Sequence, residues 1–291
     1  MATVNGGELL VRTLEQRGVR EVFALSGGHL DPIFQACLDH DFRLIDTRHE
    51  QAAAHMADGF ARATGRPGVA LVTAGPGVPD AVTGIPNAYL DSVPMICIGG
   101  RSPLRDEDRL PLQHLDQVAL MRPITKYART VFHPDHIPEY VAAAYRHAVS
   151  GRPGPVFLDI PIDVLHTPVE EREAPAFAEP APAGRPVAAP ASIEAALDAL
   201  AAAERPVIFA GGGVWFSGAQ EMVREFAELT QIPVLANPKA RGVVSERTRL
   251  GYGGFNLAGA AAVHAASGGA PDVVLMLGAR VGMFTGSSGG Q

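Results

Sequence analysis

Four short apolar runs alternate with segments of helical length over the first 166 residues. They are EVFAL at 21–25, GVALVT at 68–73, PMICIGG at 94–100 and PVFLDIP at 155–161. Runs that are apolar throughout are typical of strands covered on both faces, as in parallel sheets. Strands that alternate with helices in this way predict an α/β fold, with a parallel sheet and helices on both faces.

A change of composition ends this first domain, which we place at residues 1–166. Residues 167–190 are rich in proline and alanine and show no apolar period, so they predict a linker. A second, Rossmann-like α/β domain follows at 191–291, with strands predicted at PVIFAGGG, IPVLA and DVVLML. Three strands are few for a doubly wound sheet. We therefore expect this middle domain to be incomplete and to be finished by something outside this sequence.

Charge and cysteine usage narrow the classes of function. With 291 residues, 47% of them hydrophobic, the chain can form two domains with buried cores. The net charge of −7 comes without a basic patch, which argues against binding to nucleic acid or to an anionic membrane surface. The first residues, MATVNGGELL, show no basic stretch followed by an apolar run, and no apolar run approaches the ~18 residues of a membrane helix. Because Cys37 and Cys97 also lack metal-ligand spacing, we expect a cytoplasmic protein with reduced thiols.

One carboxylate, Glu50, stands where a predicted strand meets a predicted helix. FRLID at 42–46 predicts a short buried strand, and EQAAAHMADGFARATG at 50–65 predicts a helix closed by Gly65. Five alanines would let this helix lie close to a sheet, or to the same helix in a second subunit; they are Ala52, Ala53, Ala54, Ala57 and Ala61. A glutamate in a first turn ordinarily complements the helix dipole, so Glu50 alone indicates no chemistry.

Its sequence context is more informative. Three stretches stand out: GGELLVRTLEQRGVREVFALSGG at 6–28, RHEQAAAHMADGFARATGRPGVALVTAGPG at 48–77 and NAYLDSVPMICIGG at 87–100. They resemble the pyrimidine-binding domain of thiamine-diphosphate enzymes of the acetohydroxyacid synthase and pyruvate oxidase superfamily. Within it, residues 26–53, DQVALMRPITKYA at 116–128 and PDVVLMLGARVGMFTG at 271–286 resemble the benzaldehyde-lyase-like subgroup.

The resemblance implies roles for a first group of residues. In this family a glutamate hydrogen-bonded to N1′ of the cofactor's aminopyrimidine favours the tautomer that removes the proton from C2 of the thiazolium. The matching residue is Glu50. Thr73, Ala74 and Gly75, at the end of a predicted strand, match the positions beside the pyrimidine ring, where small residues allow the backbone to approach closely.

A second group is implied on the substrate side. His29 follows the Gly27-Gly28 turn at a strand end, and the resemblance implies that Gly27 and Gly28 also contact the cofactor. By resemblance, His29 moves protons at the substrate hydroxyl and Gln113 hydrogen-bonds the intermediate; without the resemblance both would be ordinary loop residues. Gly28 leaves space at the carbon under attack, which suits an aldehyde or acyloin substrate rather than one that needs a carboxylate anchor.

The family binds the diphosphate and Mg²⁺ through a GDG motif followed by a later asparagine, in a third domain. No GDG occurs in these 291 residues, and no metal ligands are predicted here. The family also builds each site from two chains. We therefore expect a partner chain, or a further segment of a longer enzyme, to carry the diphosphate domain in a homo- or hetero-oligomer.

Other motifs carry weaker signals. AGGGVWFSG at 210–218 follows a predicted strand, but Phe216 replaces the third glycine of a dinucleotide-binding turn. Some family members hold FAD in the middle domain, and no residue here requires it. His49 and His55 are six apart, which disfavours a metal pair, and HPDH at 133–136 predicts a loop at a helix start. The mixed-charge segment 101–109 predicts a solvated loop that could act as an active-site lid.

The sequence therefore predicts a thiamine-diphosphate-dependent lyase or carboligase acting on aldehydes and acyloins. One alternative is an acetolactate-synthase-like decarboxylase and ligase of 2-oxo acids. The other is a catalytically silent scaffold subunit that keeps the fold. The joint presence of Glu50, His29 and Gln113 favours an enzyme, because a scaffold has no physical need for all three.

Overall fold

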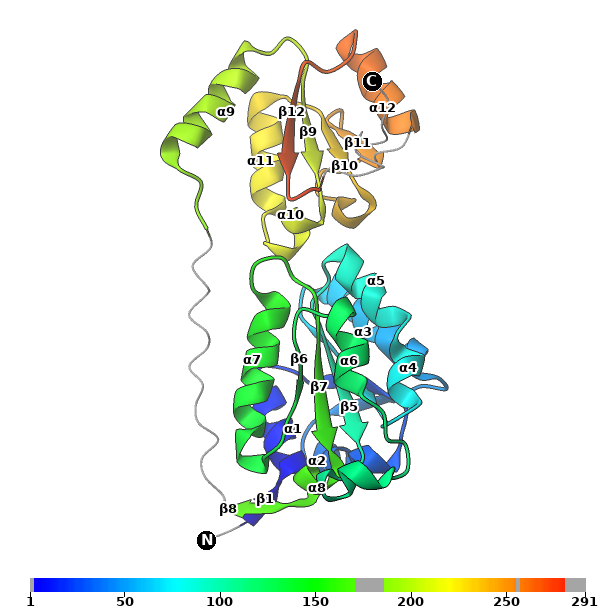
Figure 1. Cartoon of the computed structure of the whole chain (residues 1–291). Coiled ribbons are helices and arrows are strands. Elements are labelled where there is room, and N and C mark those ends of the chain that lie inside the picture. The colour runs from blue at the N-terminus through cyan, green and yellow to red at the C-terminus, as the bar shows by residue number, and fades with distance from the viewer. Residues whose placement is uncertain (1–2, 171–185, 255–256, 281–291) are drawn as a thin grey trace. The chain divides into compact units, whose positions relative to one another are not determined.

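Two units make up the chain, Met1–Gly184 and Arg185–Gln291 (Figure 1). This computed structural model describes residues 3–170, 186–254 and 257–280. Most of the predicted linker, 171–185, and the final residues, 281–291, lie outside the described residues. Each unit is described by itself below.

A six-stranded, fully parallel sheet forms the centre of the first unit, in the order β3-β2-β4-β5-β7-β6. Its strands are β2 (Glu21–Ala24), β3 (Arg43–Asp46), β4 (Gly68–Val72), β5 (Met95–Arg101), β6 (Ala128–Thr130) and β7 (Pro155–Pro161). Every residue of β4 and of β7 is buried. The predicted parallel sheet with apolar central strands is confirmed.

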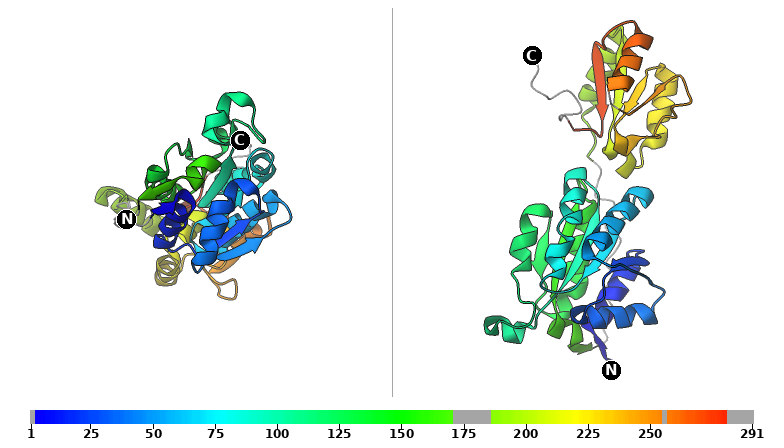
Figure 2. Two further views of the ribbon diagram at one scale, coloured as in Figure 1. Left: turned by 90° about the horizontal axis from the view of Figure 1, so that it is seen from below. Right: turned by 90° about the vertical axis from the view of Figure 1, so that its right-hand side faces the viewer.

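The strand order contains a reversal that the local sequence does not show. The chain passes from β2 outward to β3 and then returns across β2 to β4 on the other side. The carboxyl ends of β2 and β4 therefore lie side by side where two connections leave in opposite directions. Such a topological switch point is where open α/β sheets bind their ligands. In Figure 1 the strands end at the lower edge of this unit, and the left view of Figure 2 looks onto that edge.

Helices cover both faces of this sheet. One layer holds α1, α2 and α7, whose apolar residues share a core with β2, β4, β5 and β7. The other holds α3, α4 and α5 (Figure 1). The α-helices of the unit are α1 (Gly6–Gln16), α2 (Asp31–Asp39), α3 (Glu50–Thr64), α4 (Gly77–Ala81), α5 (Gly84–Asp91), α6 (Gln117–Met121), α7 (Ile137–Val149) and α8 (Ile162–His166). Short 3₁₀ turns are η1 (Gly28–Leu30), η2 (Leu104–Arg109), η3 (Arg122–Ile124) and η4 (Pro134–His136).

The alanine-rich helix α3 lies directly on the sheet, as its small side chains predict. Ala53, Ala54, Ala57 and Ala61 are fully buried. A Cβ atom built on Gly68 of β4 would lie 2.0 Å from the carbonyl oxygen of Ala57, so only glycine permits this approach. Ala52, by contrast, is exposed.

Local signals fix the helix ends. The side chain of Asn5 accepts the backbone N–H of Glu8 at 2.9 Å and so caps α1. Gly65 ends α3 with φ of 74°, a left-handed conformation that favours glycine. The predicted stop at Gly65 is confirmed.

A small antiparallel pair joins the two ends of the first unit. It consists of β1 (Thr3–Asn5) and β8 (Pro168–Glu170). Residues 168–170 fall inside the predicted linker but belong to this pair, because Val169 buries its side chain beside the core. The helix α9 begins at Pro190, the last residue assigned to the linker.

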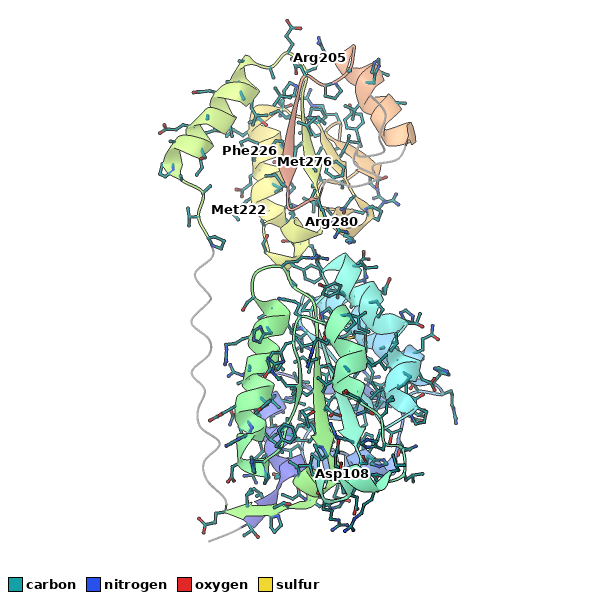
Figure 3. The ribbon with its side chains drawn as sticks, viewed as in Figure 1. Asp108, Arg205, Met222, Phe226, Met276 and Arg280 are labelled. Carbon is teal, nitrogen blue, oxygen red and sulfur yellow. The ribbon has the colours of Figure 1, made fainter. Side chains whose placement is uncertain are left out.

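The second unit contains a four-stranded parallel sheet in the order β11-β10-β9-β12. Its elements are α9 (Pro190–Ala202), β9 (Pro206–Ala210), α10 (Gly212–Phe216), α11 (Gln220–Thr230), β10 (Val234–Ala236), η5 (Pro238–Ala240), β11 (Gly251–Gly254), α12 (Leu257–Ser267) and β12 (Val273–Leu277). The prediction of three strands was wrong, since β11 has the sequence GYGG and lacks an apolar pattern. Arg205 precedes β9, whereas Arg280 follows β12 at the opposite edge of the sheet (Figure 3).

Candidate functional site

The loops after β2 and β4 touch each other at the switch point. A Cβ atom built on Gly27 would lie 2.4 Å from the side-chain Cβ and Oγ1 of Thr73. A larger residue at position 27 would therefore collide with the loop after β4. This contact joins two of the segments, 27–28 and 73–75, to which the sequence assigns cofactor contacts.

Glu50 enters the same place from the loop after β3. Thr47 holds that loop, because its backbone N–H and its hydroxyl both donate to the carbonyl of Ala24, at 2.8 and 3.1 Å. His49 caps α3 by accepting the N–H of Gln51 at 3.1 Å. Glu50 is thereby fixed as the first residue of the helix and is only 6% exposed.

The Glu50 carboxylate lies close to a glycine and makes no hydrogen bond within the described residues. A Cβ atom built on Gly77 would lie 3.1 Å from its Oε1 and 2.8 Å from Cγ2 of Thr73. Within residues 3–170, 186–254 and 257–280 the carboxylate has no hydrogen bond or ion pair. The Glu50 residue is largely buried, but its carboxylate oxygens are not among the fully buried unpaired atoms, so they reach the surface. The arrangement can therefore accept a proton or a hydrogen bond from a bound molecule.

His29 lies at the carboxyl ends of β4 and β5. A Cβ atom built on Gly100 would lie 2.7 Å from Cβ of His29 and 3.4 Å from the backbone nitrogen of Ala74. Burial lowers the pKa of His29, although the nearby Asp31 carboxylate opposes the shift. The imidazole is therefore neutral at pH 7 and can both accept and donate a proton.

Gln113 reaches the site through its backbone. Its φ of 62° is unusual for a residue other than glycine. Gly75 also has a positive φ, 62°, and a Cβ atom built there would lie 2.8 Å from Cα of Gln113. The structure thus brings together all the residues predicted for the site: Gly27, Gly28, His29, Glu50, Thr73, Ala74, Gly75 and Gln113.

Gln117 belongs to this cluster and was missed from the sequence. It is 1% exposed, and its Oε1 accepts the N–H of Gly75 at 2.8 Å. Its Nε2 donates to the carbonyl of Gly100 at 2.8 Å and to Oδ1 of Asp159 at 2.6 Å. The only sequence signal is a glutamine that opens the apolar segment QVALM of α6.

Asp159 anchors the network of which Gln117 is a part. It is fully buried in β7, and its Oδ2 accepts hydrogen bonds from Arg101 at 2.8 Å and from Thr130 at 2.9 Å. Burial raises the pKa of Asp159, and the hydrogen bond and charge of Arg101 oppose that shift. A carboxylate inside the apolar run PVFLDIP could have been singled out from the sequence.

The mixed-charge segment 101–109 is partly buried in the Asp159 network and partly exposed to solvent. Arg101 is largely buried and pairs with both Asp159 and Glu107, which corrects the prediction that it is solvated. Asp108 and Arg109 are exposed, and Figure 3 shows Asp108 at the lower edge of the first unit, where β5 and β7 end. The exposed part of the segment remains a candidate lid.

Several other predictions concern metals, thiols and membranes. In the described parts of the chain, no group of three or more His, Cys, Asp or Glu residues could hold a metal ion. Cys37 and Cys97 are unpaired and buried, and burial raises the pKa of each thiol to about 12. HPDH forms the turn η4 before α7, as predicted. None of the helices that the structure describes is both long and apolar enough to cross a membrane.

Comparison with known proteins gives matches in both units. The model of the thiamine pyrophosphate enzyme N-terminal TPP binding domain matches residues 4–120, and the model of the central domain of these enzymes matches residues 193–290. The first match includes every residue of the cluster from Gly27 to Gln117. The chain belongs to the thiamine pyrophosphate enzyme family.

Individual members of this family are similar over most of the chain. A probable acetolactate synthase large subunit of Methanocaldococcus jannaschii is 40% identical over 280 residues, which cover 95% of this chain and 47% of the relative. The acetolactate synthase isozyme 1 large subunit of Escherichia coli is 38% identical over 94% of this chain and 48% of its own length. A glyoxylate carboligase of Escherichia coli is 37% identical over 84% of this chain and 42% of its own length. The chain thus spans about half the length of the curated relatives it matches.

Proposed function

We propose that this chain provides the pyrimidine-binding part of a thiamine-diphosphate-dependent carboligase that acts on 2-oxo acids. One observation carries the proposal: Glu50 is largely buried, and its carboxylate, without a partner in the described residues, lies beside the Thr73–Gly77 segment at the switch point. The acetolactate synthases and the glyoxylate carboligase among its relatives support this substrate class over the aldehyde and acyloin substrates of a benzaldehyde-lyase-like enzyme.

The residues present fit the aminopyrimidine end of thiamine diphosphate. Glu50 would accept a hydrogen bond from N1′ and hold the proton there. The backbone of Thr73, Ala74 and Gly75 would lie against the ring, because Gly75 and Gly77 leave no side chain in its way. When bound, the cofactor supplies the nucleophilic carbon and the electron sink for making or breaking a carbon–carbon bond.

Two further side chains would act on the substrate. His29, neutral at pH 7 because burial lowers its pKa, would move a proton at the substrate oxygen. Gln113 would donate a hydrogen bond to the same part of the substrate. Gly28 is exposed, and a Cβ atom built on it would meet only the Asp31 carboxylate at 3.9 Å, so the substrate would find room beside it.

The diphosphate and Mg²⁺ would be held by residues that this sequence does not supply. We expect a chain or segment carrying a GDG motif with a later asparagine to provide them. An open groove beside Glu50, lined by His49, Gln51, Ala52, His55 and Met56, gives it a surface to cover.

The open space at Gly28 is the observation that favours the second candidate, a benzaldehyde-lyase-like enzyme.

An assay of the assembled enzyme separates the two candidate functions. This chain, the diphosphate-binding chain or segment, thiamine diphosphate and Mg²⁺ are mixed with pyruvate or with benzoin. We expect pyruvate to be consumed faster than benzoin is cleaved. Faster benzoin cleavage would overturn the substrate class, and an assembly that neither turns over nor binds thiamine diphosphate would support a scaffold.

A further inference from the structure

The side chain of Gln117 connects three neighbouring strands at the edge where the site lies. It contacts the turn after β4 through Gly75, the end of β5 through the Gly100 carbonyl, and β7 through Asp159. These three hydrogen bonds are 2.6–2.8 Å long, and Gln117 and Asp159 are both shielded from solvent. A buried amide that satisfies one donor and two acceptors at once is specific in its geometry.

The chemistry of these partners fixes the orientation of the amide. The N–H of Gly75 can only donate, so it requires the oxygen of Gln117. The Gly100 carbonyl can only accept, so it requires the nitrogen. A flipped amide would place like groups together at both contacts. Gln117 therefore cannot be replaced by glutamate without loss of the donor that faces Asp159 and Gly100.

The Gly75 contact matters because of what lies on the other side of that residue. Gly75 is the pivot of the loop between Thr73 and Gly77, with φ of 62°, and the backbone of Gln113 packs against it. The opposite end of the loop, Gly77, faces the Glu50 carboxylate. A displacement of Gly75 would therefore move the loop that separates Gln113 from Glu50.

A second connection reaches Gln113 from the other direction. The Asp159 carboxylate that accepts from Gln117 also accepts from Arg101, and Arg101 pairs with Glu107 in η2. The turn η2 ends four residues before Gln113. One network, buried except at Glu107, thus links the Gly75 loop to the turn that precedes Gln113.

We propose that Gln117 is a positioning residue, which sets the Gly75 loop and Gln113 against Glu50 without contacting cofactor or substrate itself. Its importance for a bound cofactor rests on the proposed function. Its hold on Gly75 does not, because that hold consists of contacts within this chain.

The test measures hydrogen exchange of the chain without cofactor. Gln117→Leu keeps the volume and removes all three hydrogen bonds. Exchange in peptides covering 73–77 and 110–116 should become about tenfold faster or more, as expected when a buried donor loses its partner, while peptides of α1 stay unchanged. Thr130→Val is the matched control, since it removes one hydrogen bond to the same Asp159 carboxylate but none to Gly75.

A charge exchange keeps the proposal testable if Gln117→Leu does not fold. Gln117→Glu alone sets two carboxylates against each other and should loosen the same peptides. Added Asp159→Asn restores a donor opposite the new carboxylate, which can still accept the Gly75 N–H. The double variant should therefore regain part of the protection, although the Gly100 carbonyl still lacks its donor. No change in the loop peptides, an equal rise over the whole unit, or no rescue would overturn the proposal. If Glu50→Gln leaves turnover and thiamine diphosphate binding unchanged while these exchange results hold, the proposed function fails and the role of Gln117 stands.

Discussion

Gly77 and Glu50 leave no room for a side chain between them: a Cβ atom on the glycine would lie 3.1 Å from the carboxylate oxygen Oε1. The glycine begins α4, which follows β4, and the glutamate begins α3, which follows β3. Their contact therefore depends on the strand order, in which β3 and β4 lie on opposite sides of β2. This contact keeps the Glu50 carboxylate next to the backbone at Gly77, so that a flat ring could contact both the carboxylate and the backbone.

Gly77→Ala should disturb both the fold and the site. The added methyl group crowds both Glu50 and Thr73, and overpacking of this kind costs about 1–3 kcal/mol of the free energy of unfolding. We also expect the affinity for thiamine diphosphate in the assembled enzyme to fall by about tenfold, equivalent to about 1.4 kcal/mol. Gly59→Ala, in an open position of α3, is the control and should stabilise by up to about 1 kcal/mol. Urea unfolding and calorimetric titration measure the two effects; equal behaviour of both variants would contradict the reading.

Glu50→Gln should lower turnover of the assembled enzyme by about 100-fold or more, the range found for removal of a group that handles a proton. The urea midpoint of the isolated chain should change little, since glutamine fills the same space. Glu139→Gln offers a matched control, because Glu139 is an exposed acid in the first turn of α7. If both variants lose only helix-dipole stabilisation and both keep full turnover, Glu50 has no catalytic role.

Arg101→Leu should destabilise the first unit by about 3–5 kcal/mol, because it leaves the fully buried Asp159 without its charged partner. Arg109→Leu is the control, since that side chain is 80% exposed and its pair with Asp106 spans 3.6 Å. Its effect should stay below about 0.5 kcal/mol. Urea denaturation of the three proteins at one pH gives the comparison, and a similar small effect for both arginines would show that the Asp159 pair is unimportant for stability.

The stability of α1 and α2 should depend on pH through His40. Its two ring nitrogens lie 2.9 Å from Glu8 and 3.0 Å from Glu15, and the hydrogen bond to Glu8, with those charges, raises its pKa. A raised pKa stabilises the fold fully below the unfolded value of about 6.5 and loses that effect as the pH rises through the folded value.

The carboxylates that pair with His40 set the lower limit of the pH range in which this pairing stabilises the fold. Burial acts to raise the pKa of Glu8, but the hydrogen bonds and charges of His40 and Arg12 lower it overall. Arg20 and His40 likewise lower the pKa of Glu15. These carboxylates stabilise above their usual pKa of 4.5 and lose the effect as the pH falls further. His40→Asn should therefore lower the free energy of unfolding by up to about 1 kcal/mol near pH 5.5 and by less near pH 8.5, given the partial exposure of the pair. A larger loss at the higher pH would reverse the sign and refute the assignment.

Much of the fold follows from local patterns. The continuous apolar runs of β4 and β7, the alanines of α3, the Asn5 cap and the Gly65 stop each act within a few residues of one another. The strand GYGG was missed because it has no apolar pattern of its own. It is a strand because it pairs with β10, and a local pattern does not show that pairing. Arg101 was misread because its charge is balanced by Asp159, which lies 58 residues further along the chain.

The sequence by itself determined a parallel α/β architecture and the group of residues, around Glu50, that resembles a cofactor site, because periodicity, turn residues and motif spacing are properties of adjacent positions. Only the tertiary structure decided that β2 lies between β3 and β4, which brings Gly27, Glu50 and Thr73 to one edge. It also decided that Gln117 holds Gly75 across 42 residues. Strand order and buried hydrogen bonds are settled by which distant surfaces exclude water together, and no local pattern carries that information.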